Sequence, residues 1–98
     1  MTSAASAGNL ELMKFIHEKD SSLISKTQSD GTTILHSATF NSRLEAIKWI
    51  LEIDPSLISK ETDDGDTALD WARINLRFVP ESRHDPIIEV INYLKNFK

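Results

Sequence analysis

The chain has 98 residues and a mass of 11.1 kDa, enough for one small domain with one modest core. A net charge of -4 and a pI near 5.2 argue against nucleic-acid binding, which generally needs a basic surface. The absence of cysteine excludes a disulfide framework, a thiolate zinc site and a cysteine nucleophile. No apolar run approaches the roughly 20 residues of a membrane span, and the N-terminal residues show no signal-peptide pattern. We therefore expect a soluble intracellular domain, cytoplasmic or nuclear, that contacts no membrane.

Internal repetition is the strongest signal in the sequence. Three blocks return at a common spacing of 34 residues, and one of them returns again as Ile88–Leu94 at a spacing of 44. Because three blocks rarely share one offset by chance, we expect repeat units at 3–26, 27–60 and 61–98, the last with about ten inserted residues near 76–86. The paired blocks are Leu10–Ile16 with Leu44–Ile50, Leu23–Lys26 with Leu57–Lys60, and Asp30–Leu35 with Asp64–Leu69.

Two helices are predicted in each unit, taken in chain order. In the first unit, small residues at Ala4 and Ala5 precede a second helix with closely spaced apolar residues from Leu10 to Ile16. The first helices of the next two units are expected to begin after Thr33 and Thr67, because a threonine hydroxyl can accept a hydrogen bond from a free amide of the first turn. Each threonine is followed three residues later by a polar side chain, His36 and Asp70 respectively.

The second helix of the middle unit is expected to begin at a capping box, Ser42-x-x-Glu45. It should end near Asp54, because Pro55 disfavours helical backbone at the residue before it.

The last helix is expected at 87–97, with Asp85 as its cap and Pro86 near its first position. The Asp-Gly pairs at 30–31 and 64–65 predict tight turns between units. The expected central apolar layer consists of Leu35, Ala38, Leu44, Ile47 and Ile50, joined at the next interface by Leu57 and Leu69.

Two segments, Gly31–Ala38 and Gly65–Ala72, resemble the Gly-x-Thr-Pro-Leu-His-x-Ala signature of the ankyrin repeat. The resemblance extends from Ala4 to Phe97, although the signature proline is replaced in both segments and Ser42 stands where a glycine is usual. It implies an all-α solenoid of antiparallel helix pairs joined by hairpin-like turns. It also implies non-catalytic protein binding through the turn tips and the concave helix face.

The same resemblance implies a set of partner-binding residues on the turn tips and the exposed side of the first helices. Aromatic residues in this set are typical interface anchors, although Trp71 and Ile74 have the alternative of packing under the insertion. The candidates are Ser29, Asp30, Thr32, Phe40, Asn41, Asp63, Asp64, Asp66, Trp71, Ile74 and Asn75.

Charge is concentrated in the middle of the chain. Residues 35–68 hold seven acidic and three basic side chains, so the net charge of -4 of the whole chain resides there. We expect this charge to orient a partner protein with a basic surface. The acidic turn at 63–66 lacks the twelve-residue spacing of a calcium loop, so no metal is expected.

We expect no enzyme and no cofactor, because the three histidines lie far apart without triad spacing and no glycine-rich phosphate loop is present. The resemblance implies that His36 ties neighbouring turns by hydrogen bonds. His17 is expected to face solvent or to complement the helix dipole, and nothing in the sequence assigns His84.

Two features leave alternatives open. The crowded apolar helix at 10–16 is either an imperfect cap or a contact with another chain, so the alternative function is a structural subunit that stacks on further repeats or self-associates. A monomer is expected, with self-association as the second possibility. The insertion near 76–86 either extends the preceding helix and wraps the C-terminal end or forms a specific contact loop.

Overall fold

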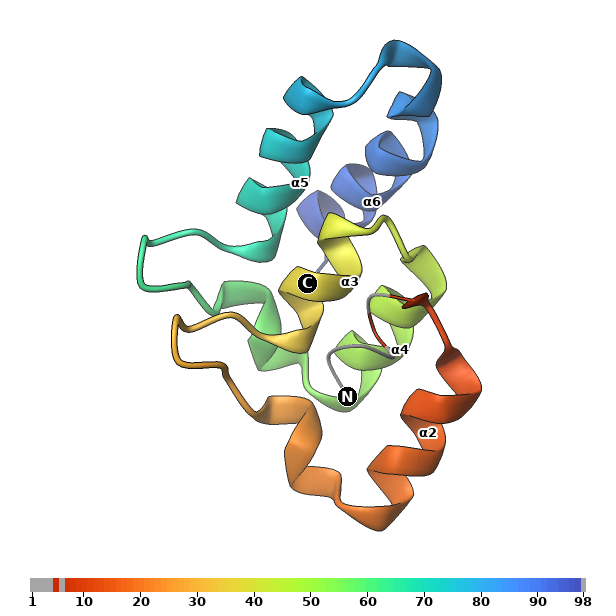
Figure 1. The fold of residues 1–98 in the computed structure, drawn as a ribbon, viewed down its shortest axis with the longest axis vertical. Coiled ribbons are helices and arrows are strands. Elements are labelled where there is room, and N and C mark those ends of the chain that lie inside the picture. Colours follow the sequence, from red (N-terminus) through yellow and green to blue (C-terminus); the bar gives the residue numbers. More distant parts are fainter. Residues whose placement is uncertain (1–4, 6, 98) are drawn as a thin grey trace.

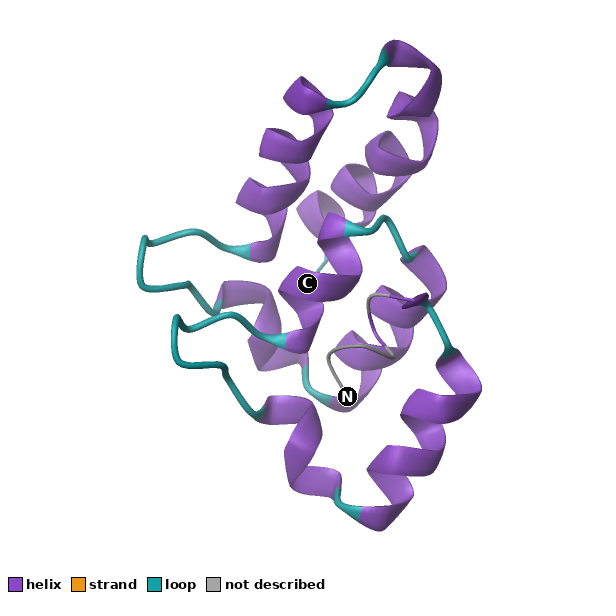
Figure 2. Cartoon of the chain, in the orientation of Figure 1, coloured by secondary structure: helices purple, strands orange, loops and turns teal. Residues whose placement is uncertain are grey.

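The computed structural model describes residue 5 and residues 7–97, and within this part of the chain it contains helices and turns but no strand. The expected all-α class is therefore confirmed (Figure 2). Ala4 lies outside the described residues. In chain order the elements are α2 (Leu10–Lys19), η1 (Ser21–Ser25), α3 (Ile34–Phe40), α4 (Leu44–Ile53), η2 (Pro55–Ser59), α5 (Ala68–Phe78), η3 (Glu81–Arg83) and α6 (His84–Asn96).

The helices form two layers (Figure 1). Helices α3 and α5 pack side by side, and two long turns project from their N-terminal ends on one side of the molecule. Helices α4 and α6 pack behind them, against α3 and α5 respectively, and α2 continues this second layer at the N-terminal end. This arrangement leaves the turns and the outward sides of α3 and α5 on one face.

Both predicted threonine caps are present. The Thr33 hydroxyl accepts from the backbone N–H of His36, and the Thr33 N–H donates to Nδ1 of the same histidine at 3.2 Å. The Thr67 hydroxyl likewise accepts from the N–H of Asp70, whose carboxylate accepts from the Thr67 N–H at 3.0 Å. These reciprocal bonds satisfy amides that the first turn of a helix leaves free.

The predicted capping box at Ser42 is wrong. Helix α4 follows Arg43, which makes no side-chain cap hydrogen bond, and Ser42 has a left-handed φ of 56°. The cause is the end of α3: the Ser42 N–H donates to the Thr39 carbonyl and the Arg43 N–H to the Ala38 carbonyl. This pattern closes a helix through a residue in the left-handed conformation. Gly8, 34 residues earlier, has a φ of 68° at the equivalent place.

The expected end of α4 before Asp54 is confirmed, but the start of the last helix differs from the prediction. Helix α6 begins at His84, Asp85 is not its cap, and Pro86 lies within the first turn. The reason is that η3 runs directly into α6, so the backbone at His84 is already helical. The insertion extends α5 as far as Phe78, and most of its remaining residues are helical as well.

Two short 3-10 helices, η1 and η2, follow α2 and α4 and were not predicted. Asp20 and Asp54 cap them by accepting from the N–H groups of Ser22 and Ser56. The Asp54 carboxylate also accepts from the hydroxyl of Ser25, so this bond joins the end of η1 to the residue that caps η2. Hydrogen bonds from Ser25 and Ser56 hold the pKa of Asp54 below its usual value.

The core is one cluster whose members extend along the chain from Ala5 to Leu94. Most of the expected central layer is fully buried, while Leu44 and Leu69 are half-buried against it. Helix α6 turns Ile87, Val90 and Leu94 inward and leaves polar residues exposed, as expected. The fully buried members of the predicted layer are Leu35, Ala38, Ile47, Ile50 and Leu57.

Candidate functional site

The candidate site begins at the two turns that project beside α3 and α5 (Figure 1). Gly31 and Gly65 each have a φ of +83°, a left-handed conformation that glycine adopts without strain. The first turn is closed by a bond from the Gln28 N–H to the Thr32 carbonyl. The Asp63 N–H donates to the Asp30 carbonyl at 2.8 Å, so a direct hydrogen bond joins the two turns.

His36 fastens the second turn to α3. Its Nε2 lies 2.9 Å from the carbonyl oxygen of Asp66. Because a carbonyl oxygen only accepts, this pattern assigns the proton to Nε2, while Nδ1 accepts from the Thr33 N–H. The bond crosses from one repeat to the next and gives His36 the linking role that the resemblance implies.

An aromatic cluster continues from His36 along the face. The Trp71 ring packs edge to face against His36, with 5.0 Å between ring centroids, and against Phe40, with 6.0 Å. Phe40 is 54% exposed and Ile74 is 41% exposed. Phe40, Trp71 and Ile74 line an open apolar hollow of about 150 Å³. The insertion therefore does not cover Ile74, and the alternative in which Ile74 packs under the insertion is wrong.

The glycine turns and the threonine caps recur with the 34-residue period of the sequence, and His36 joins the first of these caps to the following turn. The sequence profile of the family described as "Ankyrin repeats (many copies)" matches residues 1–51, just over half of the chain. The chain belongs to the ankyrin repeat family. Comparison with curated proteins and with solved structures gives no significant match. Ankyrin repeats are in general non-catalytic modules for protein–protein interaction.

The ankyrin turns hold most of the predicted polar candidates at the surface. Hydrogen bonds from Thr32 hold the pKa of Asp30 below its usual value, which favours its charged form. Asp66 is half-buried, because its carbonyl accepts from His36 and the turn closes at this residue. The exposed turn candidates are Ser29, Asp30, Asp63 and Asp64.

Three polar candidates are engaged within the ankyrin fold. Thr32 is only 5% exposed, because it lies where the turn closes on α3, and its inclusion as a contact residue is wrong. Asn75 donates from Nδ2 to the Phe40 carbonyl at 2.9 Å and so joins α5 to α3. Asn41 is exposed, but its amide donates to the Ser37 carbonyl. The bond of Asn75 depends on how α5 packs against α3, which the linear sequence does not show, whereas the bond of Asn41 is local to the end of α3.

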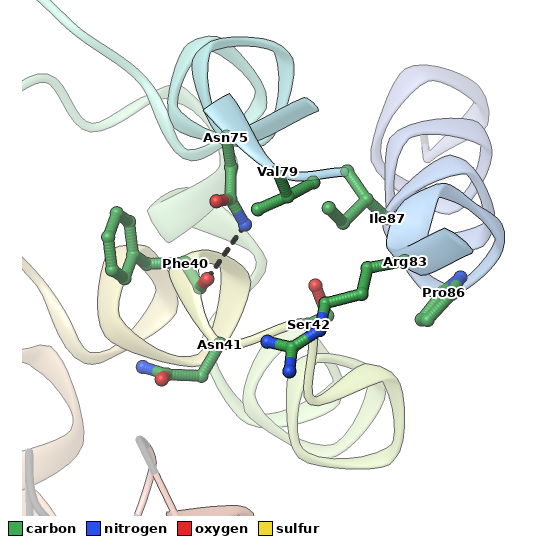
Figure 3. Close-up of a pocket in the computed structure, with 8 residues that line it drawn as sticks. All are labelled: Phe40, Asn41, Ser42, Asn75, Val79, Arg83, Pro86 and Ile87. Carbon is green, nitrogen blue, oxygen red and sulfur yellow. Dashed lines mark hydrogen bonds between the residues drawn. The ribbon is translucent and has the colours of Figure 1, made fainter. Parts of the chain in front are cut away.

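A second hollow, of about 310 Å³, lies where α3 ends and the insertion begins (Figure 3). The bond from Asn75 to the Phe40 carbonyl crosses it, and Arg83 extends over it from η3. His84 is assigned by the structure: its Nε2 donates to the Val79 carbonyl at 3.0 Å and fixes the insertion against the start of α6.

The histidines of this ankyrin chain have separate structural contacts. His17 does not face solvent: it is half-buried in the last turn of α2 and packs edge to face on Trp49 at 5.6 Å. Among the residues that the structure describes, no three His, Asp or Glu side chains are grouped as metal ligands. No helix in the described part is long and apolar enough to cross a bilayer.

Proposed function

We propose that this chain binds a partner protein, without catalysis, through a binding face made of the exposed turn residues and the apolar hollow. The hollow of Phe40, Trp71 and Ile74 carries the proposal. Three large apolar side chains gathered at one open surface leave apolar area in water, and covering that area stabilises a complex by roughly 25 cal/mol per Å². Partly exposed aromatic residues are also the side chains that most often anchor an interface.

The acidic turns indicate a partner with a basic surface. The exposed residues Asp30, Asp63 and Asp64 belong to the turns that lead into α3 and α5, the two helices that line the hollow, and residues 35–68 hold the net charge of -4. A partner that places an apolar side chain in the hollow and lysine or arginine near the turns would be attracted at a distance and fixed in orientation. The bonds from Asp63 and His36 already order the turns, so little entropy would be lost on binding.

The hollow is tested by two substitutions on one helix. Immobilised wild-type protein is used to capture partners from a lysate of the source cells, beside Ile74→Asp and the control Phe78→Asp. Phe78 is on the same helix, is 82% exposed and does not line the hollow. We expect a partner retained by wild type and Phe78→Asp and lost with Ile74→Asp. Retention by Ile74→Asp with loss at Phe78→Asp would move the binding surface to the end of α5.

The acidic turns are tested by charge removal. We expect the double variant Asp63→Asn/Asp64→Asn to bind the captured partner more weakly at low salt, with the difference shrinking as salt rises. The control is the double variant Glu81→Gln/Glu89→Gln, which removes the same number of exposed acids from η3 and α6, away from the turns. Equal effects of the two variants would show that net charge matters but the turns do not.

A further inference from the structure

Helix α2 exposes two large apolar side chains at the N-terminal end of the stack. Leu12 is 43% exposed and Phe15 is 56% exposed. Met13, between them in sequence, is buried in the core, so the helix faces the stack on one side and turns Leu12 and Phe15 away from it. The core cluster and the half-buried residues packed on it include neither side chain.

The repeat register shows what the position of Phe15 does in the other units. The equivalent residues, 34 and 78 positions later, are Trp49 and Tyr93, so all three units carry an aromatic ring here. Trp49 packs on His17 of the preceding unit. Tyr93 lies under the ammonium group of Lys48, also of the preceding unit, at 5.8 Å. This helical position is therefore a contact between units.

The position of Leu12 also indicates a contact between units. Its equivalents are Ala46 and Val90, and both are buried. Leu12 and Phe15 therefore carry the residue types of an interface between units, yet the described residues place no helix over them. The ammonium group of Lys19, on the same helix, lies 5.4 Å from the Phe15 ring and covers part of it.

The outer side of α6, at the C-terminal end of the stack, differs in charge from the exposed face of α2. Lys95 stands 44 residues after Leu51, which is buried in the middle unit. Helix α6 exposes one large apolar side chain, Ile88 at 42%, and the charge of Lys95 lies two turns later on the same side, so the outer side of α6 matches the apolar face of α2 less well than a second α2 face does. The α2 face is better matched by a copy of itself, because two-fold pairing buries both sets of apolar side chains.

We propose that the α2 face, made of Leu12 and Phe15 with Glu11 and Lys19, binds the same face of a second copy of this chain. The helices would run antiparallel, with the two-fold axis near Phe15. Glu11 and Lys19 each lie four residues from Phe15, in opposite directions. The axis therefore places Glu11 of one copy opposite Lys19 of the second copy, and this pairing of opposite charges favours the two-fold arrangement over a parallel one.

The oligomeric state tests this proposal. In sedimentation equilibrium from the micromolar range to about 1 mM, we expect the wild type to form dimers reversibly. Phe15→Asp should abolish the concentration dependence, whereas Phe78→Asp, a substitution at a still more exposed phenylalanine on α5, should leave it unchanged. Circular dichroism would establish that each variant keeps the helical fold. A monomer at every concentration, or a dimer unaffected by Phe15→Asp, overturns the proposal.

Charge reversal tests the orientation of the pair. Lys19→Glu places two acids opposite each other and should raise the dimer dissociation constant by about tenfold or more. The double variant Glu11→Lys/Lys19→Glu restores opposite charges across the axis and should recover most of the affinity. A double variant as weak as the single one would contradict the antiparallel arrangement.

Discussion

Alanine in place of Gly31 is expected to destabilise the fold more than alanine in place of Gly65. Both glycines have a φ of +83°, so a side chain meets the same backbone strain at either position. Left-handed backbone costs a residue with a Cβ about 1–2 kcal/mol. The two sites differ in their surroundings: a Cβ at Gly65 meets nothing within 4 Å, whereas a Cβ at Gly31 lies 3.0 Å from the Thr62 Cα and 3.1 Å from the Asp63 nitrogen.

The contact at Gly31 is with backbone, which cannot move aside as the end of a side chain does. The second turn must shift, and the shift stretches the bond from the Asp63 N–H to the Asp30 carbonyl. Weakening one such bond costs about 1 kcal/mol. We therefore expect the free energy of unfolding to fall by about 2–3 kcal/mol in Gly31→Ala and about 1–2 kcal/mol in Gly65→Ala.

Urea denaturation followed by circular dichroism gives both free energies of unfolding, and thermal melts should separate the two variants by roughly 4–8 °C. Equal destabilisation by the two substitutions would refute the reasoning, because it would mean that the turns do not touch in solution.

Three further predictions concern single side chains. Ser42→Gly should raise the free energy of unfolding by about 0.5–1 kcal/mol in a urea melt, because it relieves the left-handed strain. His36→Ala should lower it by about 2–4 kcal/mol in the same assay, since the bond to the Asp66 carbonyl and the cap are both lost. Hydrogen bonds lower the pKa of Asp54 in the folded state, so its contribution is present above the usual pKa and lost as the pH falls through the lowered one. Asp54→Asn should therefore be less stable at neutral pH and lose less stability on acidification below about pH 4, measured by melts across that range.

The sequence predicted those parts of the fold that depend on local chemistry. The threonine caps and the Asp-Gly turns each need only a few neighbouring residues, and both are present. The error at Ser42 arose because its position satisfies two patterns, a helix cap and the left-handed residue that ends the previous helix. The register with Gly8, 34 residues earlier, was the signal that could have distinguished them.

The candidate site could be predicted only in part, because exposure depends on how units pack. The exposure of Phe40 and Ile74 agrees with the choice of these residues, but the burial of Thr32 and the bond from Asn75 to the Phe40 carbonyl depend on the approach of α5 to α3. The η1 and η2 helices were missed although Asp20-Ser-Ser and Asp54-Pro-Ser repeat at 34 residues. Aspartate two residues before serine is a recurrent local cap and could have indicated them.

Chemical-shift mapping by NMR, with isotope-labelled protein and the captured partner, tests binding at the hollow most directly. We expect the largest shifts at the Trp71 indole and at the backbone amides of Phe40, Ile74 and residues 63–66. Shifts confined to the second hollow, where α3 ends and the insertion begins, or to the exposed side of α2, with those amides unchanged, would contradict binding at the hollow of Phe40, Trp71 and Ile74.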